Sequence, residues 1–362
     1  PVIFLSFAAV KAGNLEDAKT QIKQEIARLY WENRNLMKED IFGEGERELY
    51  YRTTVKMDDV TAQDSLRNLS EWMERYYGKK VIILLDEYDT PMQEAYVQGY
   101  WDEFTSFVRS LFNASFKTNP YLERAIMTGI TRVSKESIFS DLNNLQVITT
   151  TSDLYADCFG FTETEVFQAL DEFGMGDKKD EIKKWYDGFT FGEHRDIYNP
   201  WSITNYLDEG RLYPYWASTS SNGLVSRLIR TASADVKEKM EDLLRGQTII
   251  VNFDEQIVYN QLDDNEEAIW SLLLASGYLK VQNIDYRGIT LEPWYTLDIT
   301  NIETLSMFMT MFRGWFKNKD ANYNDFVKAL LKGSLKEMNI YMNDSLAGIC
   351  FFYNIKWPQG FV

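Results

Sequence analysis

The sequence is poor in the residues that form disulfides and metal centres. It has two cysteines, Cys158 and Cys350, which form no CxxC motif, and one histidine, His194. Structural zinc is therefore not expected, since such sites take four Cys or His ligands. So few cysteines fit a reducing compartment, and we expect the protein to be cytoplasmic. We also expect Cys158 to be buried in the core, because it lies in an apolar stretch.

Positive charge is scarce as well. The chain has 38 Lys and Arg residues against 55 Asp and Glu residues, and its net charge is −17. DNA, RNA and anionic lipid headgroups attract basic surfaces, so we do not expect this chain to bind nucleic acid. No apolar run approaches the ~18 residues of a membrane span, and we expect no membrane partner.

A phosphate-binding loop is also missing from the sequence. The motif G-x-x-x-x-G-K-[ST], whose backbone and lysine hold nucleotide phosphates, does not occur. The chain begins at Pro1, inside an apolar run and without an initiator Met, and it ends in an apolar-aromatic stretch at 351–362. Both ends are typical of cuts through folded protein, so we expect the chain to be a fragment.

The composition is otherwise that of a folded protein. Hydrophobic residues make up 45% and aromatic residues 15% of the 362 positions. This composition argues against disorder, because there is ample apolar surface to bury. The length allows two or three domains, each with its own core.

The chain is organised around residues 81–91, Val-Ile-Ile-Leu-Leu-Asp-Glu-Tyr-Asp-Thr-Pro. Five aliphatic residues predict a strand buried on both faces, as in a parallel sheet covered by helices. The strand runs into Asp86 and Glu87, at the sheet edge where open α/β folds place their ligands. Two acids there are typical of a Walker B strand, in which the first holds Mg²⁺ and the second polarises a water. The alternative from pattern alone is a core strand that ends in solvated acids.

Strands and helices alternate through the first 160 residues. We place the start of the second helix at Thr61, with Asp64 completing a capping box. The alternation predicts an α/β fold, a parallel sheet flanked by helices. Apolar runs predict strands at 2–7, 81–85, 124–129 and 157–162, and helical periodicity predicts helices at 14–29, 61–77 and 101–116.

The second half of the chain is mostly helical, with aromatic loops. Thr162 and Glu165 predict a capping box at the start of a helix that ends near Gly174. A helix at 264–276 followed by a hairpin at 277–297 predicts a winged-helix-like region.

Four landmarks resemble the bacterial AAA-ATPase-like family of STAND-type P-loop proteins. The resemblance runs from Pro1 to about Leu346. The landmarks are residues 81–91, Met-Thr-Gly-Ile-Thr-Arg-Val-Ser-Lys-Glu-Ser-Ile-Phe at 127–139, Trp-Tyr-Asp-Gly-Phe at 185–189 and Tyr-Asn-Pro-Trp at 198–201. Relatives usually carry a C-terminal PD-(D/E)XK nuclease-like domain, which is absent here.

The resemblance implies a division into four parts. They are an ATPase α/β core without its Walker A strand and loop at 1–160, a helical lid at 161–250, a winged-helix-like region at 251–318 and a helical linker at 319–362. ATP and Mg²⁺ are the implied ligands of the intact protein. Without the Walker A loop, we do not expect this chain alone to hydrolyse ATP.

The resemblance also implies roles for individual residues. Asp86 would coordinate Mg²⁺, and Glu87 would orient or deprotonate the attacking water. Thr131 would read the γ-phosphate and Arg132 would offset its charge, although an arginine there could equally form a structural salt bridge. The aromatic landmarks at 185–189 and 198–201 are expected to be packing anchors rather than ligand sites.

Three functions remain open from the sequence. The first is a nucleotide-dependent switch that binds and hydrolyses ATP and acts on a protein effector. The second is an interaction scaffold of the same fold that does not hydrolyse ATP. The third, a carbohydrate-active enzyme built on paired acids and exposed tryptophans, leaves the apolar run before Asp86 unexplained.

Overall fold

The computed structural model describes residues 1–130, 139, 142, 145–217, 223–255, 259, 262 and 265–316. The chain forms two compact units. Unit 1 comprises Pro1–Val147 with Asp254–Asp264, and unit 2 comprises Ile148–Phe253 with Asn265–Val362. No helix in the described ranges is both long enough and apolar enough to cross a membrane.

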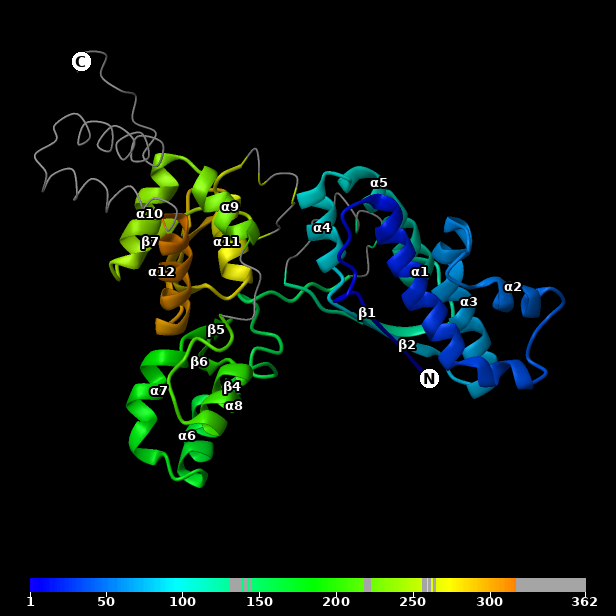
Figure 1. Cartoon of the computed structure of the whole chain (residues 1–362), viewed down its shortest axis with the longest axis horizontal. Coiled ribbons are helices and arrows are strands. Elements are labelled where there is room, and N and C mark those ends of the chain that lie inside the picture. Colours follow the sequence, from blue (N-terminus) through cyan, green and yellow to red (C-terminus); the bar gives the residue numbers. More distant parts are fainter. Residues whose placement is uncertain are drawn as a thin grey trace, which may run out of the picture. The chain divides into compact units, whose positions relative to one another are not determined.

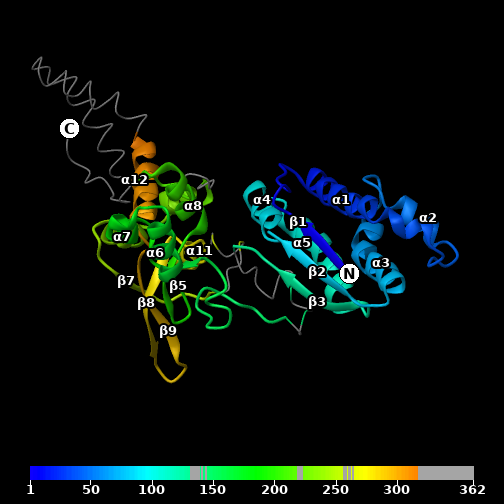
Figure 2. The same ribbon diagram turned by 90° about the horizontal axis from the view of Figure 1, so that it is seen from below.

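Unit 1 is built on a parallel sheet in the order β1-β2-β3, which confirms the predicted α/β class (Figure 2). The central strand is the aliphatic run of residues 81–85, extended by Asp86. In the register, Asp86 lies beside Ser6 of the first strand. The strands are β1 (Val2–Ser6), β2 (Val81–Asp86) and β3 (Leu122–Met127).

The main helices of unit 1 pack together on one face of this sheet (Figure 1). They are α1 (Leu15–Glu32), α3 (Asp59–Tyr77) and α5 (Trp101–Phe112). The shorter elements are η1 (Arg34–Lys38), α2 (Glu46–Arg52), α4 (Thr90–Gln98) and the π-helical turn η2 (Asn113–Lys117).

Side-chain caps determine where these helices begin. Asn14 caps α1, since its Oδ1 accepts a hydrogen bond of 2.9 Å from the backbone N–H of Asp17. The predicted cap of α3 at Thr61 is wrong. Asp58 caps this helix, and its Oδ1 accepts a 2.7 Å hydrogen bond from the Thr61 N–H. Asp58 lies three residues before Thr61, and its β-region backbone suits the cap position.

The other face of the sheet differs from the prediction. Ile83 and Leu85 are buried under the helices, but Val2, Phe4 and Ile126 on the opposite face are each more than half exposed. Among the described residues, helices therefore cover only one face, and the expectation of burial on both faces is wrong for this part of the chain. An aliphatic run predicts a strand, but it cannot show what covers each side.

Unit 2 contains two antiparallel sheets, in the orders β4-β6-β5 and β7-β9-β8. The strands are β4 (Phe161–Thr162), β5 (Phe189–Phe191), β6 (His194–Tyr198), β7 (Ile249–Val251), β8 (Leu279–Arg287) and β9 (Glu292–Ile299). The helices are α6 (Glu163–Glu172), η3 (Gly176–Lys178), α7 (Lys179–Tyr186), α8 (Pro200–Glu209), α9 (Gly223–Thr231), α10 (Ala234–Leu244), α11 (Ala268–Ala275) and α12 (Ile302–Phe316).

Several local predictions in unit 2 can be compared with the structure. The capping box of Thr162 and Glu165 forms at the start of α6. The strand predicted for 157–162 is reduced to the two residues of β4. Cys158 is an exposed free cysteine, so its predicted burial is wrong. It lies in a run of turns ahead of β4, where apolar neighbours do not form a core. Cys350 lies outside the described residues.

Candidate functional site

The candidate site in unit 1 is the carboxyl edge of the parallel sheet, where Asp86 ends β2. Ser6 Oγ, at the end of β1, donates a 3.2 Å hydrogen bond to Asp86 Oδ2. Thr128 Oγ1, just after β3, donates a 2.7 Å hydrogen bond to Asp86 Oδ1. Both carboxylate oxygens are thus fixed by the two neighbouring strands. A half-buried acid held this way has a defined direction at the sheet edge.

Glu87 occupies a tight turn after the strand. Its φ of 51° lies in the left-handed region, which is costly for a residue with a Cβ. The turn is held on both sides, because Phe7 N–H donates to Asp86 O (2.9 Å) and Tyr88 N–H donates to Thr128 O (3.0 Å). Thr90 Oγ1 donates a 2.7 Å hydrogen bond to Glu87 Oε2, so the carboxylate is positioned beside the start of α4.

Gly129 permits a close approach between the segments that follow β2 and β3. A Cβ at this position would lie 2.4 Å from Asp89 Oδ1 and 2.8 Å from a ring carbon of Tyr88. Asp89 itself is buried, at 4% exposure, and it makes no capping hydrogen bond to α4. Only glycine therefore fits at 129 without displacing these side chains.

The structure describes part of the site that the sequence predicts. Asp86 and Glu87 lie at the sheet edge, whereas Thr131 and Arg132 fall outside the described residues. Thr128 lies at the end of the strand predicted at 124–129, whose polar end the sequence places next to Asp86 and Glu87, and its hydrogen bond to Asp86 agrees with that placement. No role was predicted for Ser6. Its position at the end of β1 was the signal that could have identified it, because parallel strands meet at one edge.

The donor set at this edge is chemically suited to Mg²⁺. The carboxylates of Asp86 and Glu87 and the hydroxyls of Ser6 and Thr128 are hard oxygen ligands, the kind that Mg²⁺ prefers. Mg²⁺ is commonly bound through one or two carboxylates plus substrate phosphates. The residues present therefore fit the metal side of a nucleotide site. The phosphate loop that would complete such a site does not occur among the 362 residues.

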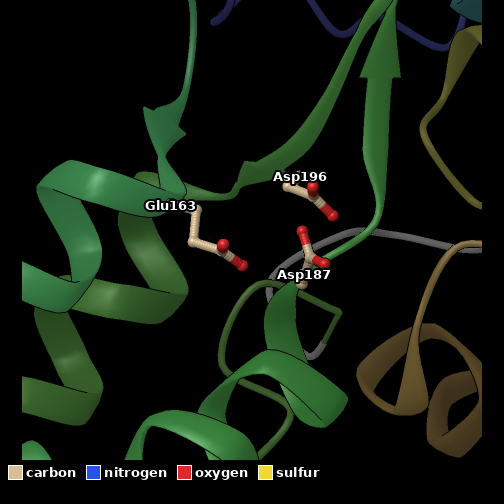
Figure 3. Close-up of side chains that lie close together, drawn as sticks. All are labelled: Glu163, Asp187 and Asp196. Carbon is tan, nitrogen blue, oxygen red and sulfur yellow. The ribbon is translucent and has the colours of Figure 1, made fainter.

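A second group of acids lies in unit 2. Carboxylate oxygens of Glu163, Asp187 and Asp196 lie within 4.8 Å of one another (Figure 3). Lys183 contacts all three acids: its Nζ bonds Glu163 Oε2 and lies 3.3 Å from Asp196 Oδ1 and 3.6 Å from Asp187 Oδ2. Because the Lys183 ammonium group already contacts all three carboxylates, we interpret the cluster as an ion-pair network rather than a metal site.

Burial changes the electrostatics of this network. Desolvation, reinforced by the neighbouring Asp196 carboxylate, raises the pKa of Asp187 from 3.8 to about 6. Burial opposes the shift at Lys183, but hydrogen bonds to Glu163 and Asp196 raise the pKa of this ammonium group. Asp187 belongs to the landmark at 185–189, for which the sequence predicts packing rather than a ligand site.

The buried Glu303 links Ser202, which follows the landmark at 198–201, to Trp216. Glu303 Oε2 accepts a 2.8 Å hydrogen bond from Ser202 Oγ, and its Oε1 accepts a 2.7 Å hydrogen bond from the Trp216 N–H. Burial raises the pKa of Glu303, while these donors act in the opposite direction. Asn199 caps α8 through the Trp201 and Ser202 N–H groups. The segment at 198–202 thus contributes packing and capping contacts.

Comparisons with known proteins add a family likeness for unit 1. Residues 1–139 match the AAA-ATPase-like family model, described as a predicted AAA-ATPase. An uncharacterised protein encoded in the vnfD 5′ region of Azotobacter chroococcum mcd 1 is 28% identical over 228 residues, which are 62% of this chain and 41% of the relative. The chain thus spans about two fifths of that relative's length. No solved structure matches the chain.

Proposed function

We propose that the carboxyl edge of β1, β2 and β3 is the metal side of a nucleotide site in an ATP-dependent switch. The observation that carries this proposal is the placement of Asp86. It ends the central parallel strand, both of its oxygens are held by neighbouring strands, and it lies in the segment that matches a predicted AAA-ATPase. An acid in this position suits a Walker B function.

Each acid has a separate role in the proposal. Asp86 holds Mg²⁺, directly or through water, with Ser6 and Thr128 fixing its orientation. Glu87 orients the attacking water once it leaves its hydrogen bond to Thr90. Thr131 and Arg132 follow the next strand in sequence, and we assign them contact with the γ-phosphate. Bound Mg²⁺ would neutralise developing charge on the phosphate oxygens.

Unit 2 supplies the proposed response to nucleotide. Residues 161–250 would act as a helical lid and residues 251–318 as a winged-helix-like region that couples nucleotide state to a protein effector. In unit 2, α11 is followed directly by the β8–β9 hairpin, an order that suits such a region. The alternative function, an interaction scaffold of the same fold, requires no hydrolysis.

ATP binding measured by calorimetry in the natural protein tests this function. We expect Mg²⁺-dependent binding that Asp86→Asn weakens at least tenfold, while Glu87→Gln keeps binding and loses turnover. Asp102→Asn, an exposed acid on α5, is the matched control and should change neither. Binding without turnover in the unmodified protein would favour the scaffold. Absence of Mg²⁺-dependent binding would refute both the metal role of Asp86 and the switch.

A further inference from the structure

The two acids of the proposed nucleotide site are held by different elements. Asp86 is fixed by the hydroxyls of Ser6 and Thr128, which lie at the ends of the neighbouring strands. Glu87 is held by a helix instead, because Thr90 Oγ1, in the first residue of α4, donates a 2.7 Å hydrogen bond to Glu87 Oε2. The carboxylate that would act on water is therefore bound to α4 and not to the sheet.

The hydrogen bond between Thr90 and Glu87 is not part of the capping of α4. A helix cap accepts a hydrogen bond from a backbone N–H of the first turn, whereas this carboxylate accepts from a hydroxyl. Asp89 is the N-cap residue of α4, and its side chain makes no capping hydrogen bond. The backbone of the turn is closed separately, by the Thr90 N–H and the Glu87 carbonyl oxygen at 3.3 Å. The helix can therefore begin without the side-chain bond.

Of the two partners, Glu87 is the one that can move. Thr90 belongs to a helix whose inner side is tightly packed, since Met92 and Ala95 are both 0% exposed. Glu87 is half-buried, and its side chain has no second hydrogen bond or ion pair within the described ranges. Rotation about the side-chain bonds of Glu87 would release its carboxylate without moving α4 or Asp86.

We propose that Thr90 is a positioning residue that withholds Glu87 from catalysis until nucleotide is bound. This inference rests on the proposed nucleotide site and concerns its regulation. While the Thr90 hydroxyl donates to Oε2, the carboxylate is directed toward the start of α4. The water that attacks bound ATP can donate to Glu87 in place of Thr90, so the carboxylate exchanges one donor for another. The rate of hydrolysis would then depend on how often Glu87 leaves Thr90.

Thr90→Val in the natural protein tests the proposal, since valine keeps the shape of threonine and removes the hydroxyl. We expect kcat for ATP hydrolysis to rise about three- to tenfold, the size expected for loss of one partly exposed hydrogen bond to a charged group. KM and Mg²⁺-dependent ATP affinity should stay unchanged, because Glu87 acts on water and not on nucleotide binding. A general loss of structure would instead lower kcat, so the two effects can be told apart.

Two further variants show whether the hydroxyl is the cause. Thr90→Ser keeps the donor and should retain the kcat of the unmodified protein. Thr61→Val is the matched control, because the Thr61 hydroxyl donates in the same way, at 3.1 Å, to the carboxylate of Asp58 at the start of α3. This control should leave kcat unchanged. A rise in all three variants, or no rise in Thr90→Val, would overturn the proposal.

The effect of Thr90 must also pass through Glu87. In a Glu87→Gln background, Thr90→Val should leave the residual turnover unchanged, so the two substitutions should be strongly non-additive. An equal gain in kcat in both backgrounds would mean that Thr90 acts on another group, and it would contradict the assignment.

These measurements separate a failure of this inference from a failure of the proposed nucleotide site. If the natural protein shows no Mg²⁺-dependent ATP binding, the site itself is refuted, and the role of Thr90 with it. If ATP binds and Glu87→Gln abolishes its turnover, but Thr90→Val does not raise kcat, only the restraint on Glu87 is wrong. Turnover that is present in Thr90→Val and absent from the unmodified protein would support the restraint in its strongest form.

Discussion

Replacing Asp187 by asparagine should make unit 2 more stable at neutral pH. The carboxyl group is only 11% exposed and lies beside Asp196, and burial raises its pKa from 3.8 to about 6. A raised carboxyl pKa means that the folded state binds the proton more tightly than the unfolded state. Stability is therefore lost as the pH rises from about 4 to about 6.

The size of this effect follows from the pKa values. The shift from 3.8 to about 6 is about 2.2 units, and each unit corresponds to about 1.36 kcal/mol, which gives about 3 kcal/mol. Asparagine resembles the protonated acid in shape and charge, and its Nδ2 can still donate to Asp196. Because pH 4 lies just above the unfolded pKa, most but not all of this difference falls within the measurable range. The stability of Asp187→Asn minus that of the unmodified protein should thus rise by about 2.4 kcal/mol between pH 4 and pH 7.

Urea unfolding at a series of pH values measures this difference. Subtracting the free energy of unfolding of the unmodified protein from that of Asp187→Asn cancels the contribution of unit 1, which the substitution does not change. Asp180→Asn, an exposed acid on α7, controls for the loss of one negative charge. A difference that stays flat from pH 4 to pH 7, or that falls, would refute the argument that Asp187 is a destabilised buried carboxylate.

Substitutions at three other places test separate parts of the structure. Gly129→Ala should destabilise unit 1 by about 1–3 kcal/mol in urea unfolding, because its Cβ would clash with Asp89 and Tyr88; an unchanged midpoint would contradict that close approach. Asp58→Ala should lower the free energy of unfolding by about 1 kcal/mol, because it removes the cap of α3, whereas Thr61→Ala should lower it much less. A larger loss for Thr61→Ala than for Asp58→Ala would instead support Thr61 as the cap. Glu303→Ala should lower the thermal midpoint of unit 2 by the equivalent of about 2 kcal/mol, since it removes the acceptor of both the Ser202 hydroxyl and the Trp216 N–H; a neutral result would mean that the buried network contributes little.

The parallel sheet could be predicted because its signal is local. The aliphatic run before Asp86 and the spacing of helices and strands in unit 1 are properties of short segments. The capping box of Thr162 and Glu165 could also be predicted, because it acts within three residues. The coverage of the second sheet face was not predictable in this way, since it depends on which distant segment packs there.

The candidate site was only partly predictable for the same reason. Asp86 and Glu87 follow a recognisable strand, but the hydroxyls of Ser6 and Thr128 come from positions 80 and 42 residues away. The network around Asp187 joins the start of α6, the end of α7 and β6, which have no common sequence motif (Figure 3). Cys158 shows the converse error, in which an apolar neighbourhood in sequence was taken for a buried one in space.

The location of a bound metal is the most direct test of the central claim. In the natural protein, Mn²⁺ with ATP should broaden the methyl NMR signal of Met127, next to Thr128 at the carboxyl end of β3, far more than that of Leu122 at the other end of the strand. A six-residue strand separates the two by about 16 Å, and broadening falls steeply with distance. Asp86→Asn should abolish the difference. Equal broadening at both ends, or a difference that survives in Asp86→Asn, would contradict a metal site at Asp86.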